Sequence, residues 1–183
     1  MNRKLVVFII TAVLICLTAA GCGINNNDAD ADGFHDLKSF TAVTLDGNGY
    51  SEQELGGVDL TMINIWSTTC GPCIKEMPEL AELEKTLPDN VNLITYCFDA
   101  SADTESVREI LRDAGFEGIT LTEGDGDLES LLHTIQYVPT TVFVDSYGNQ
   151  AGQAIIGAPA DPVEYYTQAI NDALEALGKD PIQ

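Results

Sequence analysis

The chain has 183 residues, with 29 acidic and 8 basic side chains and a formal net charge of −21 at pH 7. A surface this acidic repels phosphate backbones, so the composition argues against a nucleic-acid partner. The length is sufficient for one domain with a hydrophobic core, together with segments that do not fold with it.

The first 21 residues predict a secretory signal. Two basic residues precede an uncharged apolar run over residues 5–20, and the small-residue sequence Ala-Ala-Gly then leads directly to Cys22. This segment resembles a bacterial lipoprotein signal, in which the cysteine receives the lipid. The resemblance implies a signal peptide over residues 1–21 and lipidation of Cys22. The alternative is an uncleaved signal anchor, and both interpretations place the domain outside the cytoplasm, at a membrane.

Residues 22–36 predict an acidic, flexible tether, because they are rich in Asn and Asp and carry too little apolar surface to fold alone. Asp28, Asp30 and Asp32 match the start of a calcium loop. Position twelve of such a loop would be Ser39, where calcium requires a bidentate glutamate. We therefore expect a solvated linker, with calcium binding as the minor alternative.

The remaining chain alternates between strand and helix patterns. A hairpin is predicted around an Asp-Gly-Asn-Gly turn, and apolar side chains at helical spacing follow Pro72. In chain order, we predict a strand over 40–45, a strand beginning at 50, a short helix over 51–55, a strand over 60–66, a helix over 72–87, a strand over 91–98, a helix over 101–114, a short helix over 127–133, strands over 140–144 and 150–156, and a helix over 162–177. Strand–helix–strand alternation predicts parallel central strands, and the hairpins add antiparallel ones. We expect an α/β domain over residues 37–178, with helices on both faces of a mixed sheet, followed by a tail over 179–183.

Two cysteines, Cys70 and Cys73, lie between a predicted strand and a predicted helix. A disulfide between them closes a very small loop and stabilises the fold little, so the pair indicates redox chemistry. Pro72 suits the first turn of a helix. Unpaired N–H groups and the helix dipole there favour the thiolate of Cys70 and lower its pKa. We therefore expect Cys70 to be the exposed attacking thiol and Cys73 the shielded resolving thiol.

A longer set of motifs carries a resemblance to a known family. The sequence C-G-P-C follows a strand that ends at Trp66, and V-P-T-T follows from Val138. Together these motifs resemble the thioredoxin fold. The extra N-terminal hairpin, the lipoprotein-like start and the E-M-P after the cysteines make residues 40–177 similar to the TlpA/ResA-like family of membrane-tethered thiol–disulfide oxidoreductases.

The resemblance assigns roles to individual residues. Cys70 and Cys73 match the attacking and resolving cysteines of a redox-active disulfide, with Gly71 and Pro72 as the active-site turn. Pro139 matches a cis-proline that faces the disulfide. A cis peptide there would leave the backbone of the preceding residue free to pair with a substrate segment.

Three further positions follow from the same resemblance. The expected substrate-binding residues are Trp66, Val138 and Pro139. Trp66 is expected to pack beneath the active-site turn. Glu76 matches an acid that is placed near the thiols and exchanges protons with them; an ordinary surface glutamate is the alternative. Thioredoxin carries a buried Asp where this chain has Asn64, which increases the interest of Glu76.

We therefore predict an extracytoplasmic enzyme that reduces disulfides of exported proteins as a monomer, with a membrane thiol carrier as electron donor. No cofactor beyond the disulfide and no metal is expected. Apocytochrome c, methionine sulfoxide reductases and other exported proteins all stay open as substrates.

Two other functions compete with this one. A thioredoxin-fold copper carrier needs a wider cysteine spacing and a distal histidine, for which only His133 is available. A thiol peroxidase needs Pro and Thr where this chain has Ile63 and Ser67. The remaining cysteine, Cys97, is expected to be a buried, inert thiol.

Overall fold

The computed structural model describes residue 34 and residues 36–182. The predicted signal peptide, the predicted lipidation site Cys22 and the acidic residues Asp28, Asp30 and Asp32 lie outside the described residues. Within the described part of the chain, no helix is both long and apolar enough to cross a membrane.

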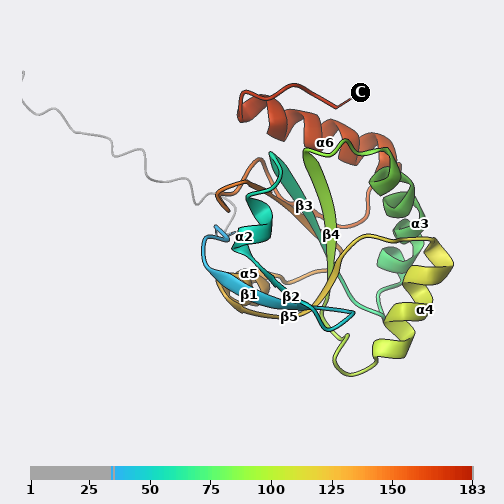
Figure 1. The fold of residues 1–183 in the computed structure, drawn as a ribbon. Helices are drawn as coiled ribbons and strands as arrows, with labels where there is room; N and C mark the ends of the chain where they lie inside the picture. Colours follow the sequence, from blue (N-terminus) through green and yellow to red (C-terminus); the bar gives the residue numbers. More distant parts are fainter. Residues whose placement is uncertain (1–33, 35, 183) are drawn as a thin grey trace, which may run out of the picture. The chain divides into compact units, whose positions relative to one another are not determined.

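A seven-stranded sheet forms the centre of the domain, in the order β2-β1-β5-β4-β3-β6-β7 (Figure 1). Its strands are β1 (Phe40–Thr44), β2 (Gly49–Ser51), β3 (Leu60–Trp66), β4 (Val91–Cys97), β5 (Thr120–Gly126), β6 (Thr140–Asp145) and β7 (Ile155–Ile156). The central strands β3, β4 and β5 are parallel, whereas β1, β2, β6 and β7 each pair antiparallel with their neighbours. The predicted mixed sheet with parallel central strands is therefore confirmed.

Helices cover both faces of this sheet, as predicted. They are α2 (Glu52–Leu55), α3 (Gly71–Thr86), α4 (Thr104–Ala114), α5 (Asp127–Thr134) and α6 (Pro162–Ala176). One apolar core lies between the sheet and α3, α4 and α6, and a second core lies between the opposite face and α2 and α5 (Figure 1). The α/β class expected from the sequence, with a mixed sheet flanked by helices, is thus the observed one.

Strand β3 occupies the middle of this layered arrangement. Its residues are buried along its whole length, and alternate side chains enter the two cores. Met62 and Trp66 contribute to the core beneath α3, and Ile63 and Ile65 to the opposite core. Burial on both faces explains why this strand is a nearly continuous apolar run in the sequence. It also directs the next residues, which include the two cysteines, to the end of the sheet.

Two strand predictions need correction. Strand β5 was not predicted, because the segment T-L-T-E-G-D-G contains two glycines and two acids, which are rare in strands. Long-range pairing makes it a strand: it pairs with β1 over five positions but with β4 at only two. The last strand, predicted over 150–156, is reduced to Ile155–Ile156, with one isolated bridge between Val144 and Gln150.

Residues at both ends of the domain contact the rest of it. Residues 179–182, predicted as a tail, contact the rest of the domain. The Lys179 Nζ lies 2.6 Å from a carboxylate oxygen of Asp59, and the backbone N–H of Ile182 donates to the Asn171 side chain at 2.7 Å. At the other end, Leu37 is fully buried. The helix predicted from residue 101 begins at Thr104, where the Asp103 side chain caps it.

Candidate active site

The two cysteines form a disulfide at the start of α3, with their Cα atoms 5.3 Å apart. Cys70 is the N-cap of the helix, and its Sγ accepts a hydrogen bond from the backbone N–H of Cys73 at 3.2 Å. Pro72 lies in the first turn, where its missing N–H removes no helical bond. Cys70 is half-buried, whereas Cys73 is fully buried. The two sulfurs therefore differ in access, and the helix N-terminus favours a negative charge on Cys70.

A cis peptide bond joins Val138 to Pro139, directly before β6. The carbonyl oxygen of Val138 lies 3.5 Å from the Sγ of Cys70, so this loop faces the disulfide. The backbone carbonyl of Pro139 accepts from the N–H of Gly157, which ties the loop to the segment before α6. The structure thus brings Val138 and Pro139 to the cysteines, where the family resemblance places them.

Trp66 is not part of the exposed surface at this site. Its side chain is fully buried and lies in the same core as Cys73. A docked protein cannot contact a side chain with no exposed surface, so the prediction that Trp66 binds substrate is wrong. The expectation that it packs beneath the active-site turn fits its place in this core.

Glu76 lies one turn after Cys73 on the buried side of α3 and is only 3% exposed. Its carboxyl accepts from the side-chain amide of Asn64 at 3.0 Å and from the hydroxyl of Tyr166 at 3.3 Å. Burial raises the pKa of Glu76 to about 7, and these two hydrogen bonds act in the opposite direction. A carboxyl with this pKa can both accept and release a proton near neutral pH. The alternative of an ordinary surface glutamate is excluded by this burial.

Tyr166 and Thr141 are two site residues that sequence reasoning missed. Both are fully buried, and the hydroxyl of Thr141 donates to that of Tyr166 at 3.3 Å. They belong to α6 and β6, far from the cysteines in the sequence. A signal for Tyr166 did exist, since it stands on the apolar face of the last predicted helix, where a phenol hydroxyl requires a partner. Its partner, however, cannot be read from the helix pattern.

The loop before the cysteines is held by Asp99, which follows β4. One of its carboxylate oxygens accepts from the backbone N–H of Thr68 at 2.9 Å, and the other accepts from the Thr68 hydroxyl at 2.6 Å. Burial alone would raise the pKa of Asp99, but the hydrogen bonds from Thr68 and Cys97 outweigh it and hold this pKa below its usual value. Sequence reasoning did not identify this residue.

Cys97 is buried and is not in a disulfide. Its thiol donates to Asp99 at 3.2 Å. Burial, together with the neighbouring carboxylate, raises the pKa of this thiol to about 12. At neutral pH such a thiol is almost entirely protonated, which fits the prediction of an inert cysteine.

A cavity of about 390 Å³ adjoins the active-site turn. It lies between the first turns of α3 and the proline-containing segment before α6, and Lys75, Glu76 and Glu79 contribute to its wall. Glu76 is therefore one of the residues beside this cavity, although its side chain is almost entirely buried.

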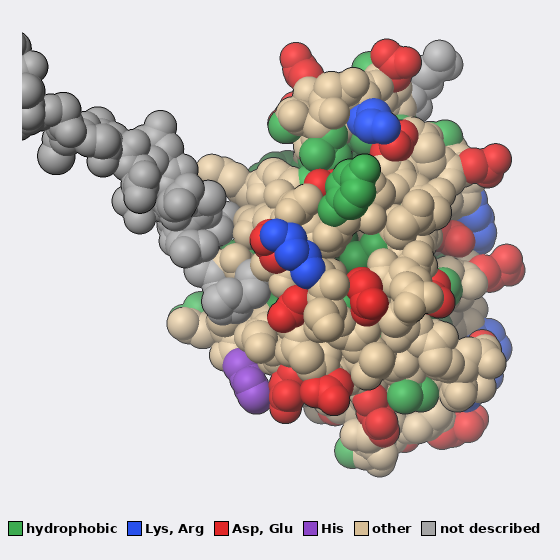
Figure 2. All heavy atoms as spheres, turned by 60° about the vertical axis from the view of Figure 1, so that its left-hand side comes forward, with side chains coloured by type: hydrophobic (Ala, Val, Ile, Leu, Met, Phe, Trp, Pro, Cys, Tyr) green, Lys and Arg blue, Asp and Glu red, His purple; other side chains and the backbone are tan. Residues whose placement is uncertain are grey.

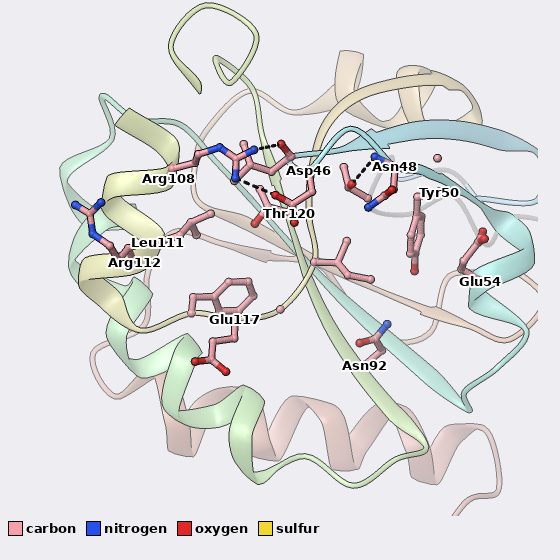
Figure 3. Close-up of a pocket in the computed structure, with 16 residues that line it drawn as sticks. Asp46, Asn48, Tyr50, Glu54, Asn92, Arg108, Leu111, Arg112, Glu117 and Thr120 are labelled. Atoms are coloured by element: carbon pink, nitrogen blue, oxygen red, sulfur yellow. Dashed lines mark hydrogen bonds and ion pairs between the residues drawn. The ribbon is translucent and has the colours of Figure 1, made fainter. Parts of the chain in front are cut away.

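A larger pocket of about 790 Å³ lies elsewhere, between the β1–β2 turn, α4 and the loop before β5 (Figure 3). At its edge, the guanidinium of Arg108 lies 2.9 Å from the Asp46 carboxylate. Neither cysteine, nor Glu76 or Pro139, lines this pocket. It is therefore separate from the disulfide.

One face of the domain carries many acidic side chains. On the face shown in Figure 2, acidic side chains are spread widely, with few Lys and Arg side chains between them. His133, the histidine considered for copper, is exposed on α5. Among the described residues, no group of three or more His, Cys, Asp and Glu side chains is arranged to hold a metal ion.

Comparison with known proteins identifies the class. A family model described as Redoxin matches residues 31–155. The chain therefore belongs to the Redoxin family and has the thioredoxin fold, in agreement with its TlpA/ResA-like resemblance. It is 26% identical over 109 residues to the thioredoxin-like protein YneN of Bacillus subtilis, strain 168. This match covers 60% of the present chain and 63% of YneN.

Solved structures share the fold. A thioredoxin-family thiol:disulfide interchange protein from Chlorobium tepidum TLS has a TM-score of 0.59 and 23% identity, and the match covers 73% of this chain and 94% of that one. The dsbF protein of MTB has a TM-score of 0.60 and 21% identity, with 79% and 98% covered. StoA from Bacillus subtilis has a TM-score of 0.55 and 21% identity, and the match covers 68% of this chain and 92% of that one. At these identities the likeness establishes the fold alone.

Proposed function

We propose that the protein is an extracytoplasmic enzyme that reduces disulfides of exported proteins. The observation that carries the proposal is the unequal environment of the two sulfurs. Cys70 stands half-buried at the N-terminus of α3, opposite the Val138–Pro139 loop, while Cys73 is fully buried behind it. An accessible nucleophile and a shielded partner are what two-step disulfide exchange requires.

The reaction begins with reduced Cys70 and Cys73. The thiolate of Cys70 attacks one sulfur of the substrate disulfide, that S–S bond breaks, and the departing substrate thiolate takes a proton from water. Cys73 then loses its proton and attacks the Sγ of Cys70. The mixed disulfide breaks, the Cys70–Cys73 bond forms, and the second substrate sulfur leaves and is protonated. Two electrons pass from the enzyme dithiol to the substrate.

Glu76 is proposed to take the proton of Cys73 in the second step. The two residues are one helical turn apart on the same face of α3, and both are buried. A buried thiol needs a nearby acceptor, because water cannot reach it and burial raises its pKa. A carboxyl with a pKa of about 7 is suited to this transfer at neutral pH.

Substrate recognition is assigned to the backbone of the loop opposite Cys70. The carbonyl of Val138 lies close to the attacking sulfur, and an extended substrate segment can pair with such a backbone as an added strand. Recognition through backbone atoms tolerates different side chains, so several exported proteins can serve as substrates. Apocytochrome c and oxidised methionine sulfoxide reductases belong to this class.

The location and electron supply of the enzyme complete the proposal. Residues 1–21 would be removed as a signal peptide, and a lipid on Cys22 would hold the domain at the membrane through the tether over residues 22–36. A similar solved structure is described as a secreted Mycobacterium tuberculosis disulfide oxidoreductase, which supports an exported location. We assign the supply of electrons to a membrane thiol carrier, and no cofactor other than the disulfide is needed.

Trapping of the mixed disulfide tests this function. The full-length variant Cys73→Ser lacks the resolving thiol and should accumulate substrates bound to Cys70, released by a reductant and identified by mass spectrometry. The matched control is Cys70→Ser, which retains Cys73 but should trap almost nothing. If the Cys73→Ser variant captures no more protein than its control, or if the purified couple proves strongly oxidising, the reductase function is wrong.

A further inference from the structure

A ring of four polar side chains lies buried beneath the active-site helix. Its members come from four separate elements: Asn64 from β3, Glu76 from α3, Thr141 from β6 and Tyr166 from α6. None of them is more than 3% exposed. Buried polar groups are costly unless they are paired, so four of them in one place require a specific arrangement.

The hydrogen bonds in this ring run toward the carboxyl of Glu76 from two sides. On one side, the Nδ2 of Asn64 donates to the Oε1 of Glu76 at 3.0 Å. On the other side, Asn64 also donates to the Oγ1 of Thr141 at 3.0 Å, Thr141 donates to Tyr166 at 3.3 Å, and Tyr166 donates to the Oε2 of Glu76 at 3.3 Å. Both carboxyl oxygens are therefore held by donors, which orients the group.

The two donors to Glu76 differ in one chemical respect. The amide nitrogen of Asn64 can only donate, so it stabilises the ionised carboxyl. The hydroxyl of Tyr166 can rotate and either donate or accept. When Glu76 is protonated, its O–H on Oε2 can donate to Tyr166, and the hydroxyls of Tyr166 and Thr141 can turn in response. Tyr166 thus remains a partner in both protonation states.

We propose that Tyr166 is a positioning residue for the resolving step: through its hydroxyl, itself held by Thr141, it orients Glu76 and keeps the transferable proton on Oε2. This inference rests on the proposed role of Glu76 as the acceptor of the Cys73 proton. Helix α6 thereby contributes to the chemistry at α3 without touching the substrate. Loss of the phenol hydroxyl leaves Glu76 with one hydrogen-bond donor and a freer carboxyl.

The charged and titratable groups around Glu76 set the direction of the expected effect. They are Cys73, Lys75 and Glu79 on α3 and Tyr166 on α6, whereas the ring residues from β3 and β6 do not titrate. Burial raises the pKa of Glu76 to about 7, and the negative charge of Glu79 acts in the same direction. The hydrogen bond from Tyr166 opposes this increase, because donors bind a carboxylate more strongly than a neutral acid. Removal of that donor should therefore raise the pKa of Glu76 further.

The decisive experiment follows the ionisation of Glu76 itself. Carbon-13 NMR of the glutamate carboxyl carbons, recorded against pH on the oxidised protein, gives the midpoint, and Glu76→Gln identifies the signal. We expect Tyr166→Phe to raise this midpoint by about one pH unit. The matched control is Tyr165→Phe, because Tyr165 is the neighbouring tyrosine on α6 and is 52% exposed. It should leave the midpoint unchanged.

A second pair of variants keeps the inference testable if Tyr166→Phe does not fold. Thr141→Val removes the hydroxyl that holds Tyr166 with little change in shape, and Thr141→Ser retains it. The valine variant should raise the Glu76 midpoint by a smaller amount than Tyr166→Phe, and the serine variant should titrate like the wild type. A simple packing role predicts equal behaviour of the two variants in this titration, which would overturn the inference.

The kinetic consequence is measured separately. A mixed disulfide between Cys70 and a small aromatic thiol releases that thiol when Cys73 attacks, and this rate should rise with pH through the Glu76 midpoint. At pH 7 the rate in Tyr166→Phe should be about fivefold below that of wild type, and it should recover at higher pH. An unchanged titration, or a shifted titration with an unchanged release profile, refutes the positioning role.

These readouts also separate this inference from the proposed function. If the wild type captures no substrate but Tyr166→Phe shifts both the titration and the thiol release, the reductase function fails and the role of Tyr166 stands. If substrates are captured normally but Tyr166→Phe titrates like the wild type, the role of Tyr166 fails and the reductase function stands.

Discussion

Replacement of Glu76 by Gln should change how the stability of the protein depends on pH. The carboxyl is buried, and its pKa rises from the usual 4.5 to about 7 on folding. Between these two values the folded state therefore binds more protons than the unfolded state. Stability from this group is fully present below pH 4.5 and is lost as the pH rises toward and beyond 7. Glutamine has a similar shape but does not ionise, so the variant lacks this loss.

The magnitude follows from the size of the pKa change. One pKa unit corresponds to about 1.4 kcal/mol, so an increase from 4.5 to about 7 corresponds to a loss on the order of 3 kcal/mol across this range. The free energy of unfolding of Glu76→Gln minus that of wild type should therefore increase by roughly this amount between pH 4 and pH 8. All other ionisable groups are common to both proteins and largely cancel in the difference.

Urea unfolding of the oxidised proteins at several pH values measures this difference. Glu82→Gln is the matched control, since Glu82 is an exposed glutamate on the same helix and the substitution removes the same charge. The difference in free energy of unfolding between this control and the wild type should stay constant across the pH range. A difference between Glu76→Gln and wild type that stays constant from pH 4 to pH 8 would refute the assignment of Glu76 as a buried carboxyl with a raised pKa.

Three other outcomes are expected. Cys97 should resist alkylation in the folded protein at pH 7, because burial raises the pKa of its thiol to about 12, whereas reduced Cys70 should react readily. Peptide mapping after brief iodoacetamide treatment measures the labelling of each cysteine, and equal labelling of the two contradicts the prediction. Asp99→Ala should lower the free energy of unfolding by about 2 kcal/mol, since it removes the acceptor that holds the loop before the cysteines. An unchanged urea unfolding midpoint argues against a stabilising role of these hydrogen bonds. Gly148→Ala should destabilise by several kcal/mol, because at a φ of +73° an added Cβ would clash with the backbone oxygen of Leu37. Gly47→Ala, also at positive φ but with nothing within 4 Å of the added Cβ, should cost only about 1 kcal/mol.

Sequence reasoning succeeded where the local pattern is strong. Strand β3 was predicted with its observed bounds, because burial on both faces produces a nearly continuous apolar run. Helix α3 was predicted within one residue, because apolar residues recur at helical spacing and Pro72 marks its first turn. In both elements the information lies in neighbouring residues.

The same reasoning failed where distant pairing decides the outcome. The segment of β5 has the composition of a loop, and it becomes a strand because β1 and β4 lie on either side of it. The family resemblance placed Trp66 in the substrate-binding set, yet the depth of a side chain depends on what packs above it. Here Trp66 lies in the same core as Cys73 and Met77 of α3, and its side chain has no exposed surface.

The sequence by itself determined the chemistry at the start of α3. Its two cysteines are too close in sequence for their disulfide to stabilise the fold much, and they lie at a helix N-terminus, where a thiolate is favoured. It also indicated Glu76 through its family resemblance. Only the tertiary structure decided that Glu76 is buried and held by Tyr166 and Asn64, which lie 90 and 12 residues away along the chain. The pKa of a carboxyl depends on its desolvation and its hydrogen-bond donors, and both are set by elements that meet only when the sheet and helices pack together.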